Sequence, residues 1–402
     1  MLLIKNGKIL TMSGCNYETG SVLIKDKKII EVGEQIVADE QEITETIDAA
    51  GSWVMPGLIE AHCHIGITEE KKGFEGDDCN EMKEPITPYI RGVDAINPMD
   101  SAFHNAICSG ITSVMVGPGS SNVVGGQFTF LKTNGRCIDE MVVLEPAAMK
   151  IALGENPKTN YNDMDKMPTT RMTISAMLRE ELFEAKQYLK KKKQAQEKGK
   201  DFEEEFRKEC WIPVLNKEIP LKAHVHRTDD ILTVIRIAKE FDVNLTLDHC
   251  TEGHLIPEHI KNSGFPAILG PAIASRSKIE VQNMDFKTAG ILHKAGVKVA
   301  ITTDHPVSRI QYLPICAGFA AKEGLGIEEG LKAITINAAE ICQVGHRVGS
   351  LESGKDADIA IFDGNPMETF TKTLYTIIDG EIVYNHKNKE KKRDQVDDPK
   401  NE

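Results

Sequence analysis

Hydrophobic and polar residues alternate along both ends of the chain, and turn signals separate the alternating runs. The first run contains Asn6-Gly7, a strong signal for a hairpin turn, and residues 21–32 have the pattern of a second hairpin pair. Residues 349–366 and 374–386 repeat this pattern near the other end. The pattern favours one small β-domain built from both termini and leaves open two unrelated β appendages.

The middle of the chain has a different pattern, in which short apolar runs alternate with helical stretches such as residues 229–241 and 286–296. Alternation of this kind over nearly 300 residues predicts a parallel α/β architecture. Periodicity alone leaves open a closed barrel or an open sheet. The strand candidates are residues 110–119, 147–154, 219–226, 243–249, 265–271 and 297–306.

Two segments of high charge depart from this alternation. Residues 173–210 have mixed charge at helical spacing. This pattern favours a helical insertion exposed to solvent over a helix that binds a partner or forms an oligomer. The tail from Lys387 onward is charged and is predicted to be disordered.

Composition restricts the class of protein. The chain has 402 residues with 41% hydrophobic and 27% charged residues, which is typical of a globular protein. Its net charge of −13 disfavours a nucleic-acid partner or an anionic membrane surface. The N-terminal residues have the pattern of a strand and not of a signal peptide, and no apolar stretch is long enough to span a bilayer. Nine scattered cysteines without a CxxC pair favour a reducing, cytoplasmic location.

Candidate chemistry begins at residues 56–66, PGLIEAHCHIG, where His62 and His64 flank Cys63 at the end of an apolar run. Side chains two apart on a strand point the same way, so the two imidazoles project together. Such a pair is able to hold one metal ion.

The same residue types recur where later strand candidates end: His224 and His226, then His249, and finally Asp304. In a parallel barrel, the carboxyl ends of all strands open on one face, where active sites of that fold lie. These six side chains are therefore predicted to converge.

Six motifs accompany these residues: VMPGLIEAHCHIG, GITSVMVGPGS, HVHRTDDI, DHCTEGH, ITTDHP and GSLESGKDADIAIFD. Through them, and over almost its whole length, the chain resembles the amidohydrolase superfamily, within it the imidazolonepropionase-like and metal-dependent prolidase-like members. The resemblance implies a distorted (β/α)8 TIM barrel at residues 57–345. It also implies a small β-sandwich formed by residues 1–56 and 346–386, followed by the charged tail at residues 387–402.

The resemblance also implies a ligand set. His62 and His64 match the histidine pair of the first barrel strand, His224 and His249 match the histidines of the fifth and sixth strands, and Asp304 matches the aspartate of the last strand. His226 is interpreted as a substrate-facing group more than as a ligand.

Relatives with two metal ions bridge them with a carboxylated lysine or a glutamate, and residues 147–158 offer both Lys150 and Glu155. A lysine becomes a carbamate only when its amine is unprotonated, which nearby metal charge favours. Lys150 is slightly preferred, and without either bridge the site holds one ion. The expected cofactor is one or two divalent ions per chain, most simply zinc.

The mechanism that follows is attack by metal-activated water on an amide or other C–N bond. Asp304 takes the proton of that water and passes it to the leaving nitrogen, and the second metal or His226 polarises the carbonyl. The expected substrate is small, such as a cyclic amide, an N-acyl amino acid or a dipeptide. The alternatives are a mononuclear deaminase of an amino-heterocycle and a catalytically silent barrel scaffold. The sequence leaves a homo-oligomer open.

Three further residues are weaker candidates for substrate binding. The glycine-rich residues 116–127 are predicted to form a strand-to-helix loop at the barrel mouth, with Gln127 lining the substrate. Arg171 and Arg227 offer guanidinium groups for a substrate carboxylate. The favoured alternative is that each arginine pairs with another group of the protein, on the surface or within the molecule.

Overall fold

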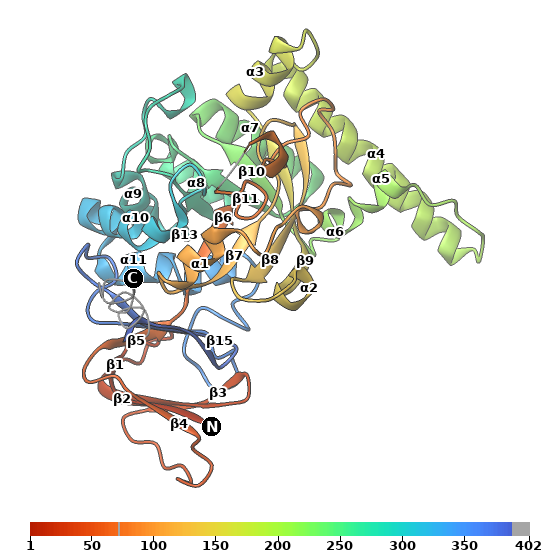
Figure 1. Ribbon diagram of the computed structural model, residues 1–402. Coiled ribbons are helices and arrows are strands. Elements are labelled where there is room, and N and C mark those ends of the chain that lie inside the picture. The colour runs from red at the N-terminus through yellow and green to blue at the C-terminus, as the bar shows by residue number, and fades with distance from the viewer. Residues whose placement is uncertain (71–72, 388–402) are drawn as a thin grey trace, which may run out of the picture.

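Two eight-stranded sheets organise the protein, one in the barrel and one formed by the two ends of the chain (Figure 1). The computed structural model describes residues 1–70 and 73–387. The predicted disordered tail therefore lies outside the described residues, apart from Lys387. None of the described helices is both long enough and apolar enough to cross a membrane.

The barrel sheet follows the order of the chain, so that each strand lies beside its sequence neighbours. Its strands are β6 (Leu58–Cys63), β7 (Ile111–Val116), β8 (Val124–Lys132), β9 (Val142–Ala152), β10 (Leu221–Val225), β11 (Leu245–His249), β12 (Ala267–Leu269) and β13 (Val299–Ile301). Most of these strands are buried on both faces, as expected for strands covered by helices. The predicted α/β fold with a distorted (β/α)8 barrel is confirmed.

Hydrogen bonds between β6 and the end of β13 bring the first and last strands together. Thr303 donates to Glu60 Oε2 from its backbone N at 2.8 Å and from its Oγ1 at 2.6 Å. Thr302 Oγ1 donates to the carbonyl of His62 at 2.7 Å. These contacts place the end of β6 beside the segment that carries Asp304.

The barrel is distorted because β8 runs antiparallel to both of its neighbours, β7 and β9. The prediction of a strand-to-helix loop over residues 116–127 is therefore wrong for residues 124–127, which belong to β8. Gly126 has a φ of +125°, and a Cβ there would lie 2.3 Å from the carbonyl oxygen of Ile90. Gly126 thus permits close approach of the loop that carries Ile90, and the chain turns directly back from β7 into β8 without an intervening helix.

The α-helices lie around the barrel and on one projecting arm (Figure 1). They are α1 (Ser101–Ile107), α2 (Ile138–Met141), α3 (Glu155–Asp163), α4 (Arg171–Glu197), α5 (Phe206–Glu209), α6 (Ile212–Leu215), α7 (Thr228–Phe241), α8 (Pro257–Ser263), α9 (Lys287–Ala295), α10 (Leu313–Ala320), α11 (Ile327–Ala333) and α12 (Ile336–Ile341). Single-turn elements are η1 (Phe74–Gly76), η2 (Gly92–Asp94), η3 (Gly253–Leu255), η4 (Ile279–Val281), η5 (Ile310–Tyr312) and the π-helical η6 (Ala321–Leu325).

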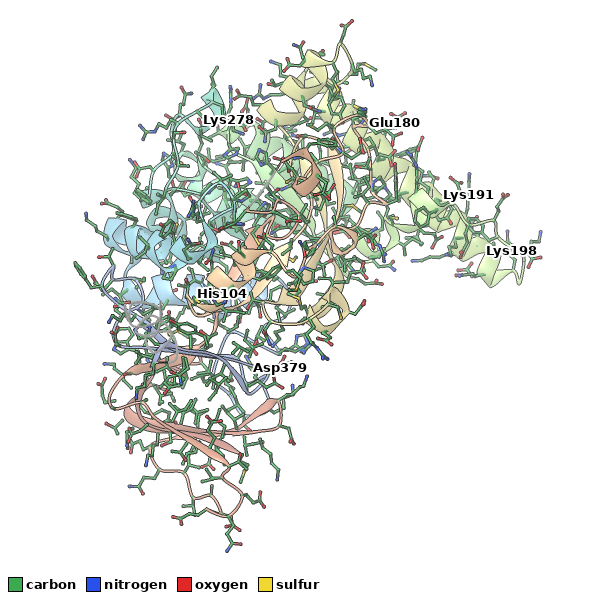
Figure 2. The ribbon with its side chains drawn as sticks, in the orientation of Figure 1. His104, Glu180, Lys191, Lys198, Lys278 and Asp379 are labelled. Carbon is green, nitrogen blue, oxygen red and sulfur yellow. The ribbon has the colours of Figure 1, made fainter. Side chains whose placement is uncertain are left out.

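The charged segment at residues 173–210 is helical, as predicted, in α4 and α5, but residues 200–205 between them are not. The first half of α4 buries an apolar stripe that includes Ile174, Leu178 and Leu182. Its second half extends away from the barrel and carries Lys191, with Lys198 at its end (Figure 2). The helix therefore packs through one half and is solvated along the other.

The second sheet combines strands from both ends of the chain. Its core includes Ile4, Val22, Val54, Ile359 and Ile377. β5 pairs with β14, and β1 pairs with β2, β4 and β5, so all eight strands form one branched sheet. The strands are β1 (Leu2–Ile9), β2 (Tyr17–Lys25), β3 (Lys28–Gly33), β4 (Glu45–Asp48), β5 (Trp53–Pro56), β14 (Ile359–Phe362), β15 (Thr373–Ile378) and β16 (Glu381–Asn385).

A buried cluster of charges joins the barrel to this sheet. Lys132, at the end of β8, is 3% exposed, and its Nζ lies 3.1 Å from Asp356 Oδ2 and 3.3 Å from Asp379 Oδ1. It also contacts the carboxylate of Asp358. Asp379 lies where the barrel meets the terminal sheet (Figure 2). One ammonium from the barrel thus neutralises carboxylates from the C-terminal segment.

Candidate metal centre

The six predicted side chains at the strand ends meet around one cavity. His62, His64, His224, His226, His249 and Asp304 all line it, together with Lys150. The cavity has a volume of about 850 Å³ including its open mouth. His249 and Asp304 adopt positive φ angles of +69° and +52°, a strained conformation that is often found at functional sites.

Two groups of three side chains are arranged so that each group could hold a metal ion. We call His62, His64 and Asp304 the first trio. Asp304 Oδ1 lies 3.5 Å from His62 Nε2 and 3.3 Å from His64 Nε2. Two imidazole nitrogens and a carboxylate oxygen therefore face one point, which is a donor set typical of zinc and related divalent ions.

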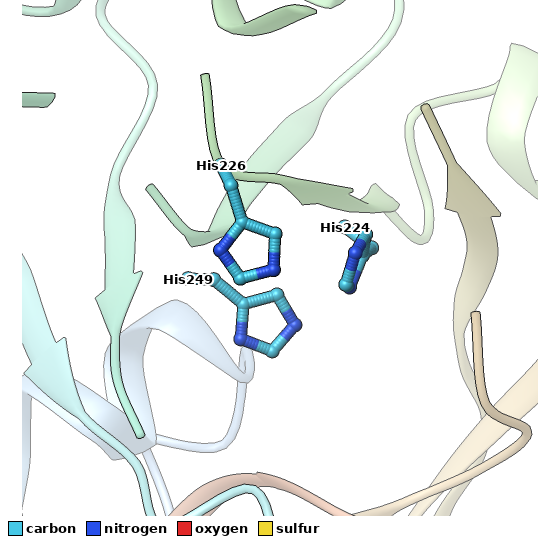
Figure 3. A group of neighbouring side chains, drawn as sticks. All are labelled: His224, His226 and His249. Carbon is cyan, nitrogen blue, oxygen red and sulfur yellow. The ribbon is translucent and has the colours of Figure 1, made fainter. Parts of the chain in front are cut away.

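The second trio consists of His224, His226 and His249, whose rings surround a common point (Figure 3). The rings of His226 and His249 are stacked, with centroids 4.8 Å apart, and His224 presents its ring at a steep angle to both. In each trio, the potential ligand atoms lie within 4.8 Å of one another. The ring centroids of His62 and His249 are only 5.1 Å apart, so the two trios adjoin.

Hydrogen bonds at Nδ1 orient most of these imidazoles. His64 Nδ1 donates to the carbonyl of Gly117 and His249 Nδ1 to that of Gly270, both at 2.7 Å. His226 Nδ1 is hydrogen-bonded with Thr251 Oγ1 at 2.7 Å. Partners of this kind set the tautomer and ring angle of metal-binding histidines.

The hydrogen-bond partner of His62 is the most polar of these groups, because it is a carboxylate. His62 Nδ1 donates to Asp248 Oδ2 at 2.6 Å, and the same carboxylate oxygen lies 3.1 Å from Lys222 Nζ. Thr246 Oγ1 donates to the other oxygen of Asp248 at 2.8 Å. All of these groups are buried, and the carboxylate increases the basicity of the imidazole.

Lys150 is buried in the cavity beside His62. Its side chain is buried at the end of β9, with Nζ 3.3 Å from His62 Nε2. Burial is the main cause that lowers the pKa of Lys150 to about 8, so roughly a tenth of the amine is unprotonated at pH 7. That state is the one required for carboxylation.

Glu155, the alternative bridging residue, does not line the cavity. It begins α3, and its Oε2 accepts a hydrogen bond from the backbone N of Glu280 at 3.1 Å. Its side chain is therefore occupied away from the two trios.

Burial controls the protonation of most of the histidines. Desolvation lowers the pKa of His62, His224 and His226 well below the usual value, and it also lowers the pKa of His249. Neutral imidazoles are the form that binds metal. Burial opposes protonation of His64 too, but Cys79 and Asp304 outweigh burial and raise its pKa to about 10.

Asp304 provides a test of whether this donor set fits a cation. Its Oδ1 is buried and accepts no hydrogen bond from the described residues. Although burial favours the neutral acid, His249 and His64 lower the pKa of Asp304 below its usual range. A buried, ionised carboxylate oxygen that accepts no hydrogen bond from the described residues and lies beside two imidazole nitrogens fits a bound metal ion.

A model of the amidohydrolase family matches residues 162–383, more than half of the chain. The chain belongs to the amidohydrolase family. The superfamily resemblance of its motifs is thereby confirmed. As a member of this family, the protein is a metal-dependent hydrolase that acts on carbon–nitrogen bonds.

Individual relatives agree with this assignment. The crystal structure of an amidohydrolase from Thermotoga maritima MSB8 is 38% identical in sequence and has a TM-score of 0.92, covering 96% of this chain and 100% of that one. The amidohydrolase tasK of Hapsidospora irregularis is 28% identical over 91% of this chain, which spans only 40% of the length of tasK. A 5-methylthioadenosine/S-adenosylhomocysteine deaminase of Caldicellulosiruptor saccharolyticus is 24% identical, covering 95% of this chain and 93% of the relative.

In this amidohydrolase, the three predicted substrate-binding residues do not line the cavity. Gln127 lies in β8, and its Nε2 donates to the carbonyl of Pro88 at 3.0 Å. Arg171 Nε pairs with Asp230 at 3.0 Å, and Arg227 pairs with Asp229 through two bonds of 3.0 Å. The two guanidinium groups thus have the intramolecular partners that the sequence analysis favoured.

Sequence reasoning missed several residues of the site of this amidohydrolase. Asp248 pairs in register with His224 of the neighbouring strand β10 and contacts His62. The signal for it in the sequence was an acidic residue in the apolar run directly before His249. Glu280, in η4, and Asn156, in α3, contact His224 Nε2 at 3.4 and 3.3 Å. These two residues lie in segments without periodicity, so no local pattern indicated them.

Proposed function

We propose that this amidohydrolase hydrolyses an amide bond of a small molecule, such as a cyclic amide, an N-acyl amino acid or a dipeptide. One observation carries the proposal: two adjoining trios of metal-ligand side chains face a single cavity, which Lys150 also lines, beside His62. Two neighbouring cation sites suit the polarisation of a carbonyl and the activation of water at the same time.

The residues of the first trio have separable tasks. A divalent ion, which we propose to be zinc, would be held by His62, His64 and Asp304, and it supplies a Lewis acid that makes water nucleophilic near neutral pH. Asp304 is ionised at that pH because its pKa is lowered, so its carboxylate can take up a proton and return it to the leaving nitrogen. The Asp248–His62 hydrogen bond keeps the first trio in place during this transfer.

We further propose that the enzyme works in the cytoplasm on a free small molecule, without a nucleic-acid or membrane partner. The net charge of −13 supports only the absence of a nucleic-acid or anionic-membrane partner, because it repels polyanions.

Deamination of an amino-heterocycle is the second candidate, since a deaminase is among the relatives that align over nearly the whole chain. The two reactions leave different products. Amide hydrolysis liberates a carboxylate, whereas deamination releases ammonia and leaves a carbonyl on the ring.

A substrate screen distinguishes these functions. Zinc-loaded protein is incubated with cyclic amides, N-acyl amino acids, dipeptides and amino-heterocycles, and carboxylate formation and ammonia release are measured in parallel. The His62→Ala variant is the control for contaminating activity, because it lacks one ligand of the first trio. New carboxylate without ammonia supports the proposal. Ammonia release from a heterocycle alone favours the deaminase, and a fully metal-loaded protein without turnover favours the silent scaffold.

A further inference from the structure

A buried carboxylate outside the predicted ligand set faces the second trio. Glu280, in η4, is 1% exposed, and its Oε1 lies 3.4 Å from His224 Nε2 and 3.7 Å from His226 Nε2. A carboxylate oxygen at this distance from two imidazole nitrogens resembles the arrangement of Asp304 in the first trio. Each trio thus has one acidic side chain directed at its imidazoles.

The position of Glu280 is held by the backbone of α3. Glu280 Oε2 accepts a hydrogen bond from the backbone N of Glu155 at 2.9 Å, and Glu155 Oε2 accepts one from the backbone N of Glu280. Gly154, with a φ of +91°, makes this approach possible, because a Cβ there would lie 2.9 Å from Glu280 Oε2. One oxygen is therefore anchored, and the other is left to face the trio.

Lys278 is the cation that balances this oxygen. Its Nζ contacts Glu280 Oε1 at 2.5 Å and donates to Asn156 Oδ1 at 2.6 Å. The side chain of Lys278 is 28% exposed and lies toward the outer end of the barrel (Figure 2). It can therefore move into solvent when another cation takes its place, whereas Glu280 and the imidazoles are enclosed.

We propose that His224, His226, His249 and Glu280 form a complete site for the second divalent ion, so that this ion is bound without carboxylation of Lys150. Three imidazoles and one carboxylate would give zinc four protein ligands, and expansion to five-coordination would still admit a substrate oxygen. In this arrangement, His226 is a ligand and Lys150 remains an amine beside His62. The proposal depends on metal binding and not on the identity of the substrate.

Metal stoichiometry tests the proposal independently of activity. Metal-free protein is reconstituted with Zn²⁺ in carbon dioxide-free buffer and in bicarbonate buffer, and zinc per chain is measured by elemental analysis after gel filtration. The wild-type chain is expected to bind two ions in both buffers. Glu280→Gln and His226→Gln are each expected to bind one, and Lys150→Met is expected to bind two.

The Lys278→Met variant is the matched control for Glu280→Gln. It breaks the same ion pair but removes no ligand, so it is expected to keep two ions. His226→Gln tests the same site without touching Glu155 or Lys278, which keeps the proposal falsifiable if Glu280→Gln does not fold. Thermal unfolding of each metal-free variant verifies the fold.

Several results would overturn the proposal. The proposal is wrong if Glu280→Gln or His226→Gln still binds two ions. It is also wrong if Lys150→Met binds only one, or if the wild-type chain binds the second ion only in bicarbonate buffer. A wild-type chain that binds a single ion in both buffers has the same consequence. A carbamate signal from Lys150 in ¹³C NMR spectra of the zinc-loaded chain with labelled bicarbonate would also contradict it.

Discussion

Replacing Asp248 by asparagine tests how the support of His62 contributes to the metal centre. The substitution preserves the size of the side chain but removes its negative charge. In the wild-type chain, Asp248 Oδ2 accepts from His62 Nδ1 at 2.6 Å and faces Lys222 Nζ at 3.1 Å, with both carboxylate and ammonium buried. Asparagine therefore weakens two interactions that have different consequences.

The expected magnitudes follow from these two contacts. Loss of a carboxylate that orients a metal-binding histidine weakens metal affinity about 10- to 100-fold, or about 1.4 to 2.7 kcal/mol. Loss of one partner of a buried ion pair costs about 3 to 5 kcal/mol of folding stability. The lower end applies here, because Lys222 Nζ still donates to the carbonyl of Ala61 at 2.9 Å. We therefore expect about 3 kcal/mol of destabilisation.

Two assays separate the effects. Urea unfolding of the metal-free protein gives the stability change, and competition with a chromophoric zinc chelator at neutral pH gives the metal affinity. The control is Asp230→Asn, which removes another buried carboxylate whose ion-pair partner is Arg171, with Nε at 3.0 Å. The control should lose stability but keep its metal affinity.

The reasoning is refuted if Asp248→Asn folds and binds the first zinc ion with an affinity within twofold of the wild-type value. It is equally refuted if Asp230→Asn weakens zinc binding as much as Asp248→Asn does, since the effect would then be a general loss of stability.

Three further predictions concern the join between the sheets and the proton carrier. Lys132→Met should lower the free energy of unfolding by about 3 to 5 kcal/mol, because it leaves buried carboxylates without their ammonium partner; a change below about 1 kcal/mol in urea unfolding would contradict this. Although burial opposes it, Lys132 and Lys28 lower the pKa of Asp356 to about 2, below its value of 3.8 in the unfolded chain. Its stabilising effect is therefore present above about pH 4 and is lost as the pH falls through 2, so the destabilisation caused by Asp356→Asn should shrink between about pH 6 and pH 3 in thermal unfolding. Asp304→Asn changes one ligand of the first trio, so it is assayed with zinc in excess and its zinc content is checked by elemental analysis; at matched zinc content it should lose most of its turnover, and unchanged turnover would exclude Asp304 as the proton carrier.

Much of the fold could be predicted because its signals are local. The hairpin predicted at residues 21–32 is formed by β2 and β3, and the apolar runs before His62, His224 and His249 are strands β6, β10 and β11. The hairpin turn predicted at Asn6-Gly7 is wrong, because these residues lie inside β1, where its register with β2 shifts. A period of two in a strand and the ending of a strand are properties of a few neighbouring residues. The antiparallel direction of β8 was missed because apolar content does not encode strand direction.

The site was predicted only in part, for the same physical reason. Residues at strand ends share one rim of a barrel, so His62, His64, His224, His249 and Asp304 could be expected to meet. Nothing in the sequence around Arg171 and Arg227 indicated that these arginines would form ion pairs with Asp230 and Asp229. Their partners depend on which charged groups compete for them once the helices are packed.

The sequence by itself determined the elements and most of the donor atoms, because each depends on a short stretch of chain. Only the tertiary structure decided how the donors divide into two trios, that Glu280 faces the second trio, and that Lys132 joins the barrel to the terminal sheet. Those outcomes depend on barrel curvature and on groups brought within a few ångströms from distant parts of the chain, where burial makes an unpaired charge too costly to leave without a partner.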